Sequence, residues 1–269
     1  MTTAIAGHPL RVEDAPDRRG LARFLAVGRA VYAGSRCRFL TDEIAIRQLV
    51  GRRSCFRDHA RVESCVVVDG RHDVARFCLV HDRLLRDRVQ VAFFEALPGL
   101  VGLADVIVDA ARRRFPGVPL LVAGLNGHLD LGAGFLLDAF DAPQMFGLPY
   151  SPPYYPGYFA GFDAIALASY RFPVRDYVAF GADAGAGAAA RIRVRALDFG
   201  AFDRDVGIYN ALCNACFRGH PFWSERPLAD DLEDFRSLRP FLSGEYLLFA
   251  EEGGEPVGFL LWFPDFHEM

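Results

Sequence analysis

Apolar and polar positions follow two different periods along this chain, and these periods predict its secondary structure. Apolar residues at three- and four-residue spacing indicate helices, and short apolar runs bounded by Gly, Pro or Asp indicate strands. Up to residue 170 the predicted elements are helices at 19–32, 41–50 and 103–115, strands at 63–68, 74–80, 88–95, 119–123 and 164–170, and a short helix within 153–160. The polar residues 1–18 are expected to be loosely held. This order predicts an α/β domain with a mixed sheet flanked by helices.

A second, shorter set of elements follows a Gly/Ala-rich stretch at residues 179–190, whose composition is that of a linker. The predicted elements beyond it are a strand at 191–197, helices at 205–218 and 228–241, and a hairpin at 246–250 and 256–263. A lead-in segment, two helices and a hairpin thus occur in both parts of the chain, which is a repeat of architecture rather than of sequence. We expect an N-terminal domain over residues 1–178, the linker, and an incomplete C-terminal half over residues 191–269.

The longest irregular stretch, residues 123–163, is the first candidate for a binding site. It passes through a polar bend at Asn126, Gly127 and His128, crosses a Gly-rich segment and ends in a cluster of prolines and tyrosines. A compact domain seldom carries so long a connection unless the connection has a role, so it is expected to form a binding loop.

Composition narrows the function classes. The chain is 52% hydrophobic and 24% charged with a net charge of −4, which gives no overall attraction to nucleic acid or to an anionic membrane. All 30 basic residues are arginine, so mechanisms that need a lysine, such as a Schiff base or a P-loop, are excluded. No secretory signal and no membrane-spanning apolar run are evident, so a cytoplasmic protein with reduced thiols is expected. Cys213 and Cys216 lack further ligands at metal-site spacing, and we expect packing cysteines and no metal.

Several short sequence segments, by their order and spacing, resemble those of one known fold. The matching phrases span about residues 20–265 and are Phe56 with His59-Ala60, Val68-Asp-Gly with Val74-Ala-Arg76, Phe93-Phe-Glu95, residues 134–141, residues 149–155, Gly161-Phe-Asp163 and residues 250–259. The chain resembles the GCN5-related N-acetyltransferase (GNAT) superfamily, and in particular its tandem-GNAT, YghO-like group of acyltransferases. The resemblance implies the transfer of an acyl group to an amine, with acyl-CoA as a possible donor.

The resemblance also implies where an acyl-CoA would bind. In a typical GNAT a basic, Gly-rich loop follows the third long strand, and its amides hold the pyrophosphate of the cofactor at a helix N-terminus. The matching residues here are Leu97, Pro98, Gly99, Leu100, Val101 and Gly102, of which Leu97, Gly99, Val101 and Gly102 are the candidate cofactor-binding residues. This loop has no basic residue, its glycine spacing differs, and its proline lacks one donor. The donor could therefore be a carrier-protein thioester or an aminoacyl-tRNA instead.

Glu95 and two tyrosines are the candidate proton-transfer groups that the resemblance implies. Glu95 ends an apolar strand beside the candidate cofactor loop, so apolar neighbours would raise the pKa of a general base there; the alternative is a solvent-facing strand end. Tyr154 and Tyr155 match the Pro-Tyr-Tyr phrase of the closer relatives and are candidates for the general acid that protonates the leaving thiolate. Aromatic packing beneath a proline-rich loop is the alternative reading for both.

Asn126 and His128 follow a strand at the place where an open α/β sheet presents its ligand-facing loop. Asn126 could orient a carbonyl or amine group, and His128 could move protons near neutral pH. Asn-Gly is also a strong turn dipeptide, so a purely structural turn is the alternative.

Together these features predict an N-acyltransferase of GNAT fold that forms an amide between an activated acyl or aminoacyl donor and a small amine, as in natural-product biosynthesis. Two other classes stay open: a non-catalytic, GNAT-like small-molecule-binding protein, and a GNAT-fold enzyme with chemistry other than acyl transfer. Convergence of Glu95, His128 and the Tyr154–Tyr155 pair on one cleft would favour an enzyme. No membrane partner is expected, and the oligomeric state is left open.

Overall fold

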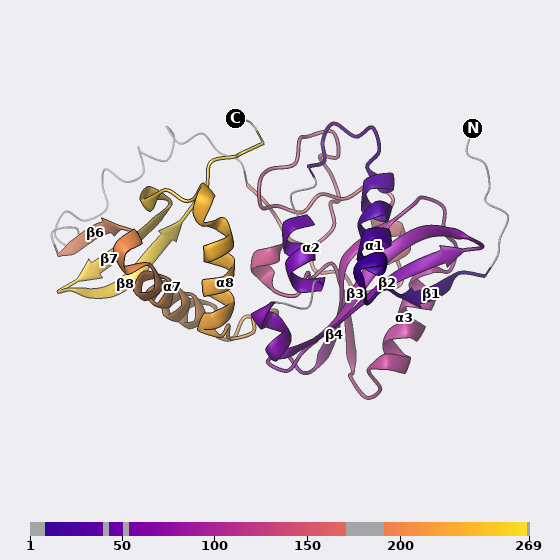
Figure 1. Cartoon of the computed structure of the whole chain (residues 1–269), viewed down its shortest axis with the longest axis horizontal. Coiled ribbons are helices and arrows are strands. Elements are labelled where there is room, and N and C mark those ends of the chain that lie inside the picture. The colour runs from indigo at the N-terminus through magenta and orange to yellow at the C-terminus, as the bar shows by residue number, and fades with distance from the viewer. Residues whose placement is uncertain (1–8, 40–42, 51–53, 171–190, 268–269) are drawn as a thin grey trace. The chain divides into compact units, whose positions relative to one another are not determined.

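The computed structural model describes residues 9–39, 43–50, 54–170 and 191–267, and over these residues the chain is a mixed α/β protein (Figure 1). It divides into two compact units. Unit 1 comprises Met1–Phe162, Gly219–Glu225 and Asp265–Met269, and unit 2 comprises Asp163–Arg218 and Arg226–Pro264. The Gly/Ala-rich stretch at 179–190 and the domain boundary expected at residue 178 lie outside the described residues.

The sheet of unit 1 has five strands, in the spatial order in which they occur along the chain. The strands are β1 Arg11–Asp14, β2 Ala60–Asp69, β3 His72–Asp82, β4 Arg88–Ala96 and β5 Leu120–Ala123. The first four pair antiparallel, and β5 pairs parallel to β4. The hairpin expected around Asp69-Gly70 is confirmed, and the sheet is mixed, as the order of elements predicted.

Helices cover both faces of this sheet. They are α1 Arg18–Val31, α2 Glu43–Val50, α3 Leu103–Arg114 and the short α4 Tyr155–Tyr158, with single 3₁₀ turns η2 Cys55–Asp58 and η3 Leu129–Leu131. Successive strand residues point to opposite faces, so Val66 and Cys78 pack with α1 and α2, whereas Val67 and Phe77 pack with α3 and Tyr155. Figure 1 shows α1 and α3 on opposite sides of the sheet.

Two expectations from the sequence are wrong. Arg11–Asp14 is an edge strand paired with β2, because its main chain completes the sheet although its side chains are mostly polar. The apolar stretch at residues 164–170 forms no strand, and Ile165, Leu167 and Tyr170 are exposed by 67%, 66% and 83%. Alternating apolar residues supply a strand-like face, but a strand also needs main-chain pairing, and the described residues 164–170 pair with no strand of either sheet.

Strand β4 carries a bulge just before its end. Phe93 has a φ of 50°, which is unusual for an aromatic residue, and the pairing with β3 shifts register between Arg76 and Cys78. The displaced amide of Phe93 donates to Asn126 Oδ1 at 2.7 Å, which compensates for the lost ladder hydrogen bond. The bulge redirects the last residues of β4, including Glu95.

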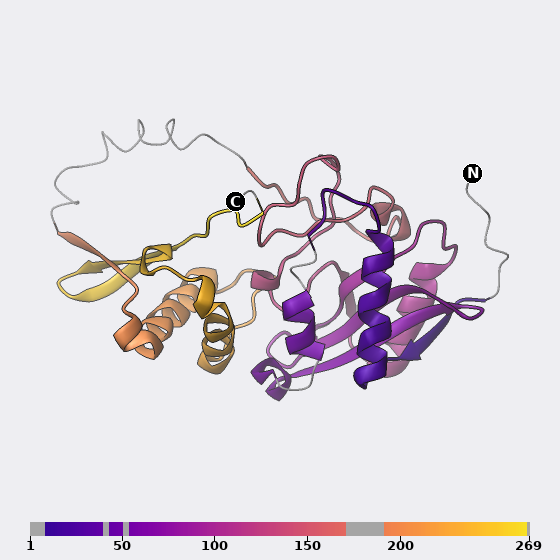
Figure 2. The same cartoon turned by 45° about the horizontal axis from the view of Figure 1, so that its top comes forward.

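Unit 2 repeats the first part of unit 1. Its elements are β6 Ile192–Ala196, η4 Phe199–Ala201, α7 Phe202–Phe217, α8 Leu228–Leu238, η5 Arg239–Phe241, η6 Gly244–Tyr246, β7 Leu247–Glu252 and β8 Glu255–Leu261. The three strands are antiparallel in the order β6-β7-β8, matching β1-β2-β3, with two helices between the first and second strands in each unit. In the turned view both helices lie on one side of the sheet (Figure 2). The element order predicted for this part is confirmed.

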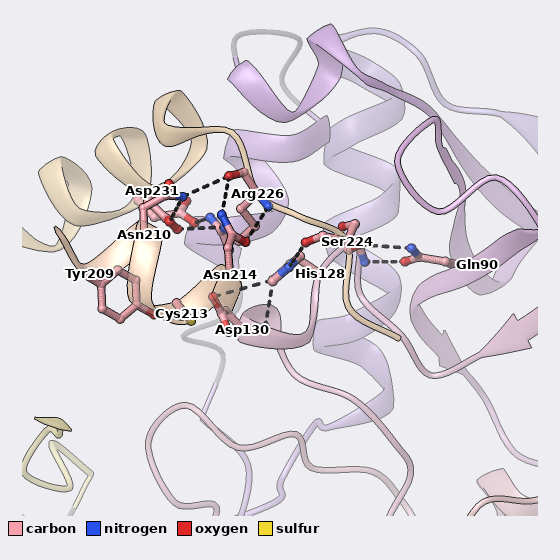
Figure 3. Close-up of polar contacts among 12 residues, drawn as sticks. Gln90, His128, Asp130, Tyr209, Asn210, Cys213, Asn214, Ser224, Arg226 and Asp231 are labelled. Atoms are coloured by element: carbon pink, nitrogen blue, oxygen red, sulfur yellow. Dashed lines mark hydrogen bonds and ion pairs between the residues drawn. The ribbon is translucent and has the colours of Figure 1, made fainter. Parts of the chain in front are cut away.

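A buried polar network holds α7 and α8 of unit 2 together. Arg226 contacts Asp231 at 2.8 Å, and the side-chain amides of Asn210 and Asn214 both donate to the Arg226 carbonyl at 3.0 Å (Figure 3). Paired charges with satisfied hydrogen bonds can be buried at acceptable cost, so this network has a structural explanation. None of the helices in the described part of the chain is long and apolar enough to cross a membrane.

Candidate active site

Glu95 lies at the C-terminal end of β4 and is 5% exposed. The Tyr155 hydroxyl donates to its Oε2 at 2.5 Å, and the guanidinium of Arg76 lies 3.7 Å from its Oε1. Arg76 faces Glu95 because the two residues are paired across β3 and β4. The sheet register therefore assembles a buried acid, a buried guanidinium and a phenol in one place.

Helix α1 is shaped to admit the Arg76 side chain. A Cβ added at Gly28 would lie 2.8 Å from the Arg76 guanidinium carbon, so only glycine leaves enough room. The Arg76 guanidinium also lies 4.8 Å from the centre of the Phe24 ring and donates to the Phe24 carbonyl at 3.3 Å. Arg76 is thus held from the helix side while its other face points toward Glu95.

Burial gives Glu95 an unusual acidity. Removal of its carboxyl group from water raises the pKa of Glu95 to about 7, and the opposing effects of Arg76 and the Tyr155 hydrogen bond are smaller. Burial and the Glu95 charge likewise raise the pKa of Tyr155, so this phenol stays protonated and acts as a donor. A carboxyl group that titrates near neutral pH can accept and release a proton under physiological conditions.

Three tyrosines around α4 bind the end of β4 and the loop that follows it. The Tyr154 hydroxyl donates to the Ala96 carbonyl at 2.9 Å, and the Tyr158 hydroxyl donates to the Leu97 carbonyl. Tyr155 accepts from the Ala96 amide at 2.8 Å besides donating to Glu95. All three tyrosines therefore have structural hydrogen bonds, and of the two candidates only Tyr155 contacts Glu95.

A groove of about 640 Å³ lies beside this cluster, at the N-terminus of α3. Its lining residues are Gly99, Leu100, Val101, Gly102, Leu103, Ala104, Asp105, Val108, Tyr154, Gly157, Tyr158, Ala160, Gly161 and Phe162. Three of the four residues named as cofactor-binding candidates, Gly99, Val101 and Gly102, thus line the groove. Leu97 packs against the core beneath it. Tyr154 belongs to both the groove and the cluster at the end of β4.

The groove fits the pyrophosphate of an acyl-CoA poorly. Gly102, the N-cap of α3, provides no side-chain cap, so the amides of the first turn are available as donors to an anion. However, the groove contains no basic side chain, Pro98 of the adjoining loop lacks an N–H, and Asp105 places a carboxylate in the first turn of α3. Two phosphates would meet a negative charge and no positive one, so no role is assigned here to the nucleotide portion of CoA.

Asn126 and His128 are held in structural roles. Asn126 supports the bulge of β4, and Gln90 exchanges two hydrogen bonds with the main chain of Gly127, at 2.7 and 3.0 Å. His128 Nδ1 accepts from the Asp130 amide, and its Nε2 donates to the Ser224 carbonyl, each at 3.4 Å (Figure 3). The His128 ring packs edge-on against Trp223, whereas Tyr155 packs against Phe94 and Phe135. The predicted residues therefore fall into two groups, with Glu95, Tyr154 and Tyr155 together.

The sequence analysis did not identify Arg76, Gly28 or Tyr158 as parts of this site. An arginine inside the apolar run of β3 needs a partner, and Glu95 stands in the next apolar strand, so these two charges were the signal from which the pair could have been found. Gly28, a glycine inside an apolar helix, likewise indicates a place where another group comes close to the helix backbone. Among the described residues, no group of three or more His, Cys, Asp or Glu side chains is placed to hold a metal ion. Cys213 is buried near the Tyr209 hydroxyl, and Cys216 is exposed.

The chain matches no family model, no curated protein and no solved structure among those compared. The geometry of the site itself therefore carries the functional argument.

Proposed function

We propose that the chain is an amide-forming acyltransferase that moves an acyl group from a thioester or ester to a small amine, with Glu95 as the general base. The observation that carries this proposal is the buried Glu95, whose pKa is raised to about 7 at the end of β4, beside a groove lined by Tyr154. A base that titrates near neutral pH is suited to receive a proton from an attacking amine.

The reaction needs one base and one acid. The amine nitrogen forms a bond with the acyl carbon, its proton passes to Glu95, and the bond from the acyl carbon to the leaving sulfur or oxygen breaks with its electron pair. Tyr154 lines the groove, and burial raises the pKa of its hydroxyl, so it stays protonated at neutral pH. Its proton, which the Ala96 carbonyl accepts in the structure, passes to the leaving group, and the proton taken up by Glu95 then restores the phenol. Tyr155 orients Glu95 through its 2.5 Å hydrogen bond, so we assign it a positioning role.

The arrangement of elements supports this proposal independently. The order strand, two helices, hairpin, long strand, helix and parallel strand agrees with the GNAT fold that the sequence resembles. In that family the donor lies at the loop after the long strand, which is where the groove opens. The partial repeat in unit 2 agrees with the tandem-GNAT group, whose members include proteins that take aminoacyl-tRNA or carrier-protein thioesters, and a role in natural-product biosynthesis would suit such a chain.

A second function is favoured by the enclosure of Glu95. Its carboxyl group is almost fully buried and already contacts Tyr155 and Arg76, an arrangement that would also suit a purely structural polar cluster. In that case the groove would bind a small molecule without transforming it. A GNAT-like binding protein is therefore the alternative function, and the experiment must distinguish it from the acyltransferase.

Incubation of the purified chain with acetyl thioesters and a panel of primary amines, followed by mass spectrometry, tests the proposal. Amide formation that is lost in Glu95→Gln, while ligand binding by calorimetry is retained, would support acyl transfer. Binding without any amide product would support the binding protein. Absence of both binding and product across acetyl, longer acyl and aminoacyl thioesters would exclude both functions for these ligands.

A further inference from the structure

We propose that the groove binds the uncharged arm of a thioester donor and makes no favourable contact with a nucleotide pyrophosphate. The preferred donor is then a thioester on a neutral, amide-containing arm of the pantetheine type, whether the arm is free or joined to a carrier. This inference rests on the proposed function and specifies its donor.

The lining of the groove is the first observation behind this inference. Of the fourteen lining residues only Asp105 carries a charge at neutral pH, and the remainder are glycines, aliphatic residues, one phenylalanine and two tyrosines. Nucleotide phosphates are usually held by arginine or lysine side chains or by glycine-rich loops of main-chain amides. A surface without a cation gives no charge-assisted hydrogen bond to such a group.

Asp105 is the second observation. Its carboxylate lies in the first turn of α3, where it opposes the partial positive charge of the helix N-terminus. That partial charge is the feature that makes other helix N-termini bind anions, and here it is already offset within the protein. An incoming phosphate would instead be repelled by the Asp105 carboxylate.

The groove does provide what an uncharged arm needs. Leu100, Val108 and Phe162 supply apolar walls for methylene groups, and apolar walls with a few polar groups are the usual composition of a ligand site. The uncapped amides of α3 can donate to the arm's carbonyl oxygens without a charge on either side. The Tyr154 side chain connects this groove to the end of β4, where Glu95 is held.

Calorimetric titration with three probes tests the inference on the full chain. Acetyl-pantetheine contains the arm alone, acetyl-CoA contains the arm and the nucleotide, and adenosine 3′,5′-bisphosphate contains the nucleotide without the arm. We expect acetyl-pantetheine and acetyl-CoA to bind with dissociation constants within about threefold of each other, a ratio worth less than 1 kcal/mol. We expect no binding of adenosine 3′,5′-bisphosphate.

Two pairs of variants locate the effect in the groove. Asp105→Asn should tighten acetyl-CoA binding about fivefold, as expected for removal of one nearby like charge at the surface, and should leave acetyl-pantetheine unchanged. Asp109→Asn, one helical turn away on an exposed position outside the groove, should change neither. Ala160→Trp should fill the groove and abolish binding of both thioesters, whereas Ala142→Trp, also exposed but outside the groove, should not.

The outcomes separate the inference from the proposed function. If acetyl-CoA binds thirtyfold or more tightly than acetyl-pantetheine, the inference is wrong and the proposed function stands with an ordinary CoA donor. If adenosine 3′,5′-bisphosphate competes with acetyl-CoA, the inference is wrong for the same reason. If neither thioester binds and no amide forms from either, the proposed function and the inference both fail.

Discussion

Two buried carboxyl groups in this protein, Glu95 in unit 1 and Asp205 in unit 2, both have arginine partners, and yet their pKa values are shifted in opposite directions. Asp205 accepts four hydrogen bonds between 2.7 and 3.1 Å, two from Arg195, one from Arg204 and one from the Asp198 amide. Burial acts to raise the pKa of Asp205, but these donors together lower it below its usual value. Glu95 accepts one short bond from Tyr155 and lies 3.7 Å from Arg76, and its pKa is raised to about 7.

The difference shows that an arginine neighbour alone does not decide whether a buried carboxyl group is ionised. Several direct hydrogen bonds to the charged form compensate for the loss of water around Asp205. Around Glu95 the effects of Arg76, Tyr155, Arg38 and Tyr32 all lower the pKa, but together they do not compensate for that loss. Asp205 is therefore suited to hold unit 2 together. The Glu95 carboxyl group is partly protonated at neutral pH and can both accept and release a proton, which suits proton transfer.

The largest expected effect is on the reaction of the Glu95→Gln variant. Glutamine has the same shape but accepts no proton, so the rate of amide formation should fall by about 10²- to 10⁴-fold while donor binding is unchanged. Steady-state rates and calorimetric titrations of both proteins give the comparison. Glu252→Gln, at an exposed position at the end of β7, is the control and should keep its rate. A rate within twofold of wild type for Glu95→Gln would show that Glu95 takes no proton.

The corresponding change in unit 2 should affect stability instead. Asp205→Asn removes the charge that accepts two hydrogen bonds from Arg195, whose half-buried guanidinium keeps Glu251 as its remaining partner, at a cost of about 2 kcal/mol in the free energy of unfolding. Urea unfolding measures this loss, and the rate of amide formation per folded molecule should not change. A loss below about 1 kcal/mol would mean that the Asp205 hydrogen bonds contribute little to the unit.

Glu95 should make stability fall as the pH rises. The pKa of an unperturbed glutamate is about 4.5 and that of Glu95 in the folded chain is about 7, so the folded protein binds more protons than the unfolded chain between these pH values. The contribution of Glu95 is therefore most favourable below pH 4.5 and is lost as the pH rises through 7, by on the order of 3 kcal/mol. The difference in unfolding free energy between wild type and Glu95→Gln, measured from pH 5 to 8, should follow this curve. A difference that does not vary with pH would contradict a raised pKa.

A smaller change should come from Gly28→Ala in α1. The new methyl group would lie 2.8 Å from the Arg76 guanidinium carbon and force that group to shift, at a cost of about 1–3 kcal/mol in stability. Because Arg76 lowers the pKa of Glu95, a shift of the guanidinium from the Gly28 side toward Glu95 should lower that pKa and move the rise of the reaction rate to lower pH. In Gly207→Ala of α7, the matched control, the methyl group meets only Leu228 atoms at 3.9 Å or beyond, and stability should be kept or gained.

The sequence predicted the elements that depend on local patterns. The two N-terminal helices, the hairpin around Asp69-Gly70 and the later helices and hairpin follow from periodicity and turn residues, and the structure confirms them. Elements that depend on a distant partner were predicted wrongly. Arg11–Asp14 is a strand because the edge of β2 is available, and residues 164–170 form none although their pattern is strand-like.

The candidate site shows the same limit. Glu95 was selected as the end of an apolar strand beside a glycine-containing loop, at a position where the family resemblance implies a base, and Tyr154 and Tyr155 were selected from the Pro-Tyr-Tyr segment of that resemblance. Arg76 faces Glu95 because of the register between β3 and β4, and Gly28 accommodates Arg76 because α1 packs on the sheet. Neither the register nor the packing can be predicted from a local sequence motif. His128 was grouped with Glu95 because both follow strands, but its contacts are with Trp223 and Ser224, almost a hundred positions further along the chain.

A direct measurement of the two carboxyl acidities tests the central claim, that Glu95 is held ready to exchange a proton while Asp205 is not. Carbon-13 NMR of the side-chain carboxyl groups, with Glu95→Gln and Asp205→Asn used to assign the two signals, follows both in one pH titration. The account predicts that Glu95 titrates near pH 7 and that Asp205 stays ionised below its usual pKa of 3.8. A Glu95 signal that titrates at or below 4.5 would contradict the account and leave the cluster at the end of β4 with a structural role alone.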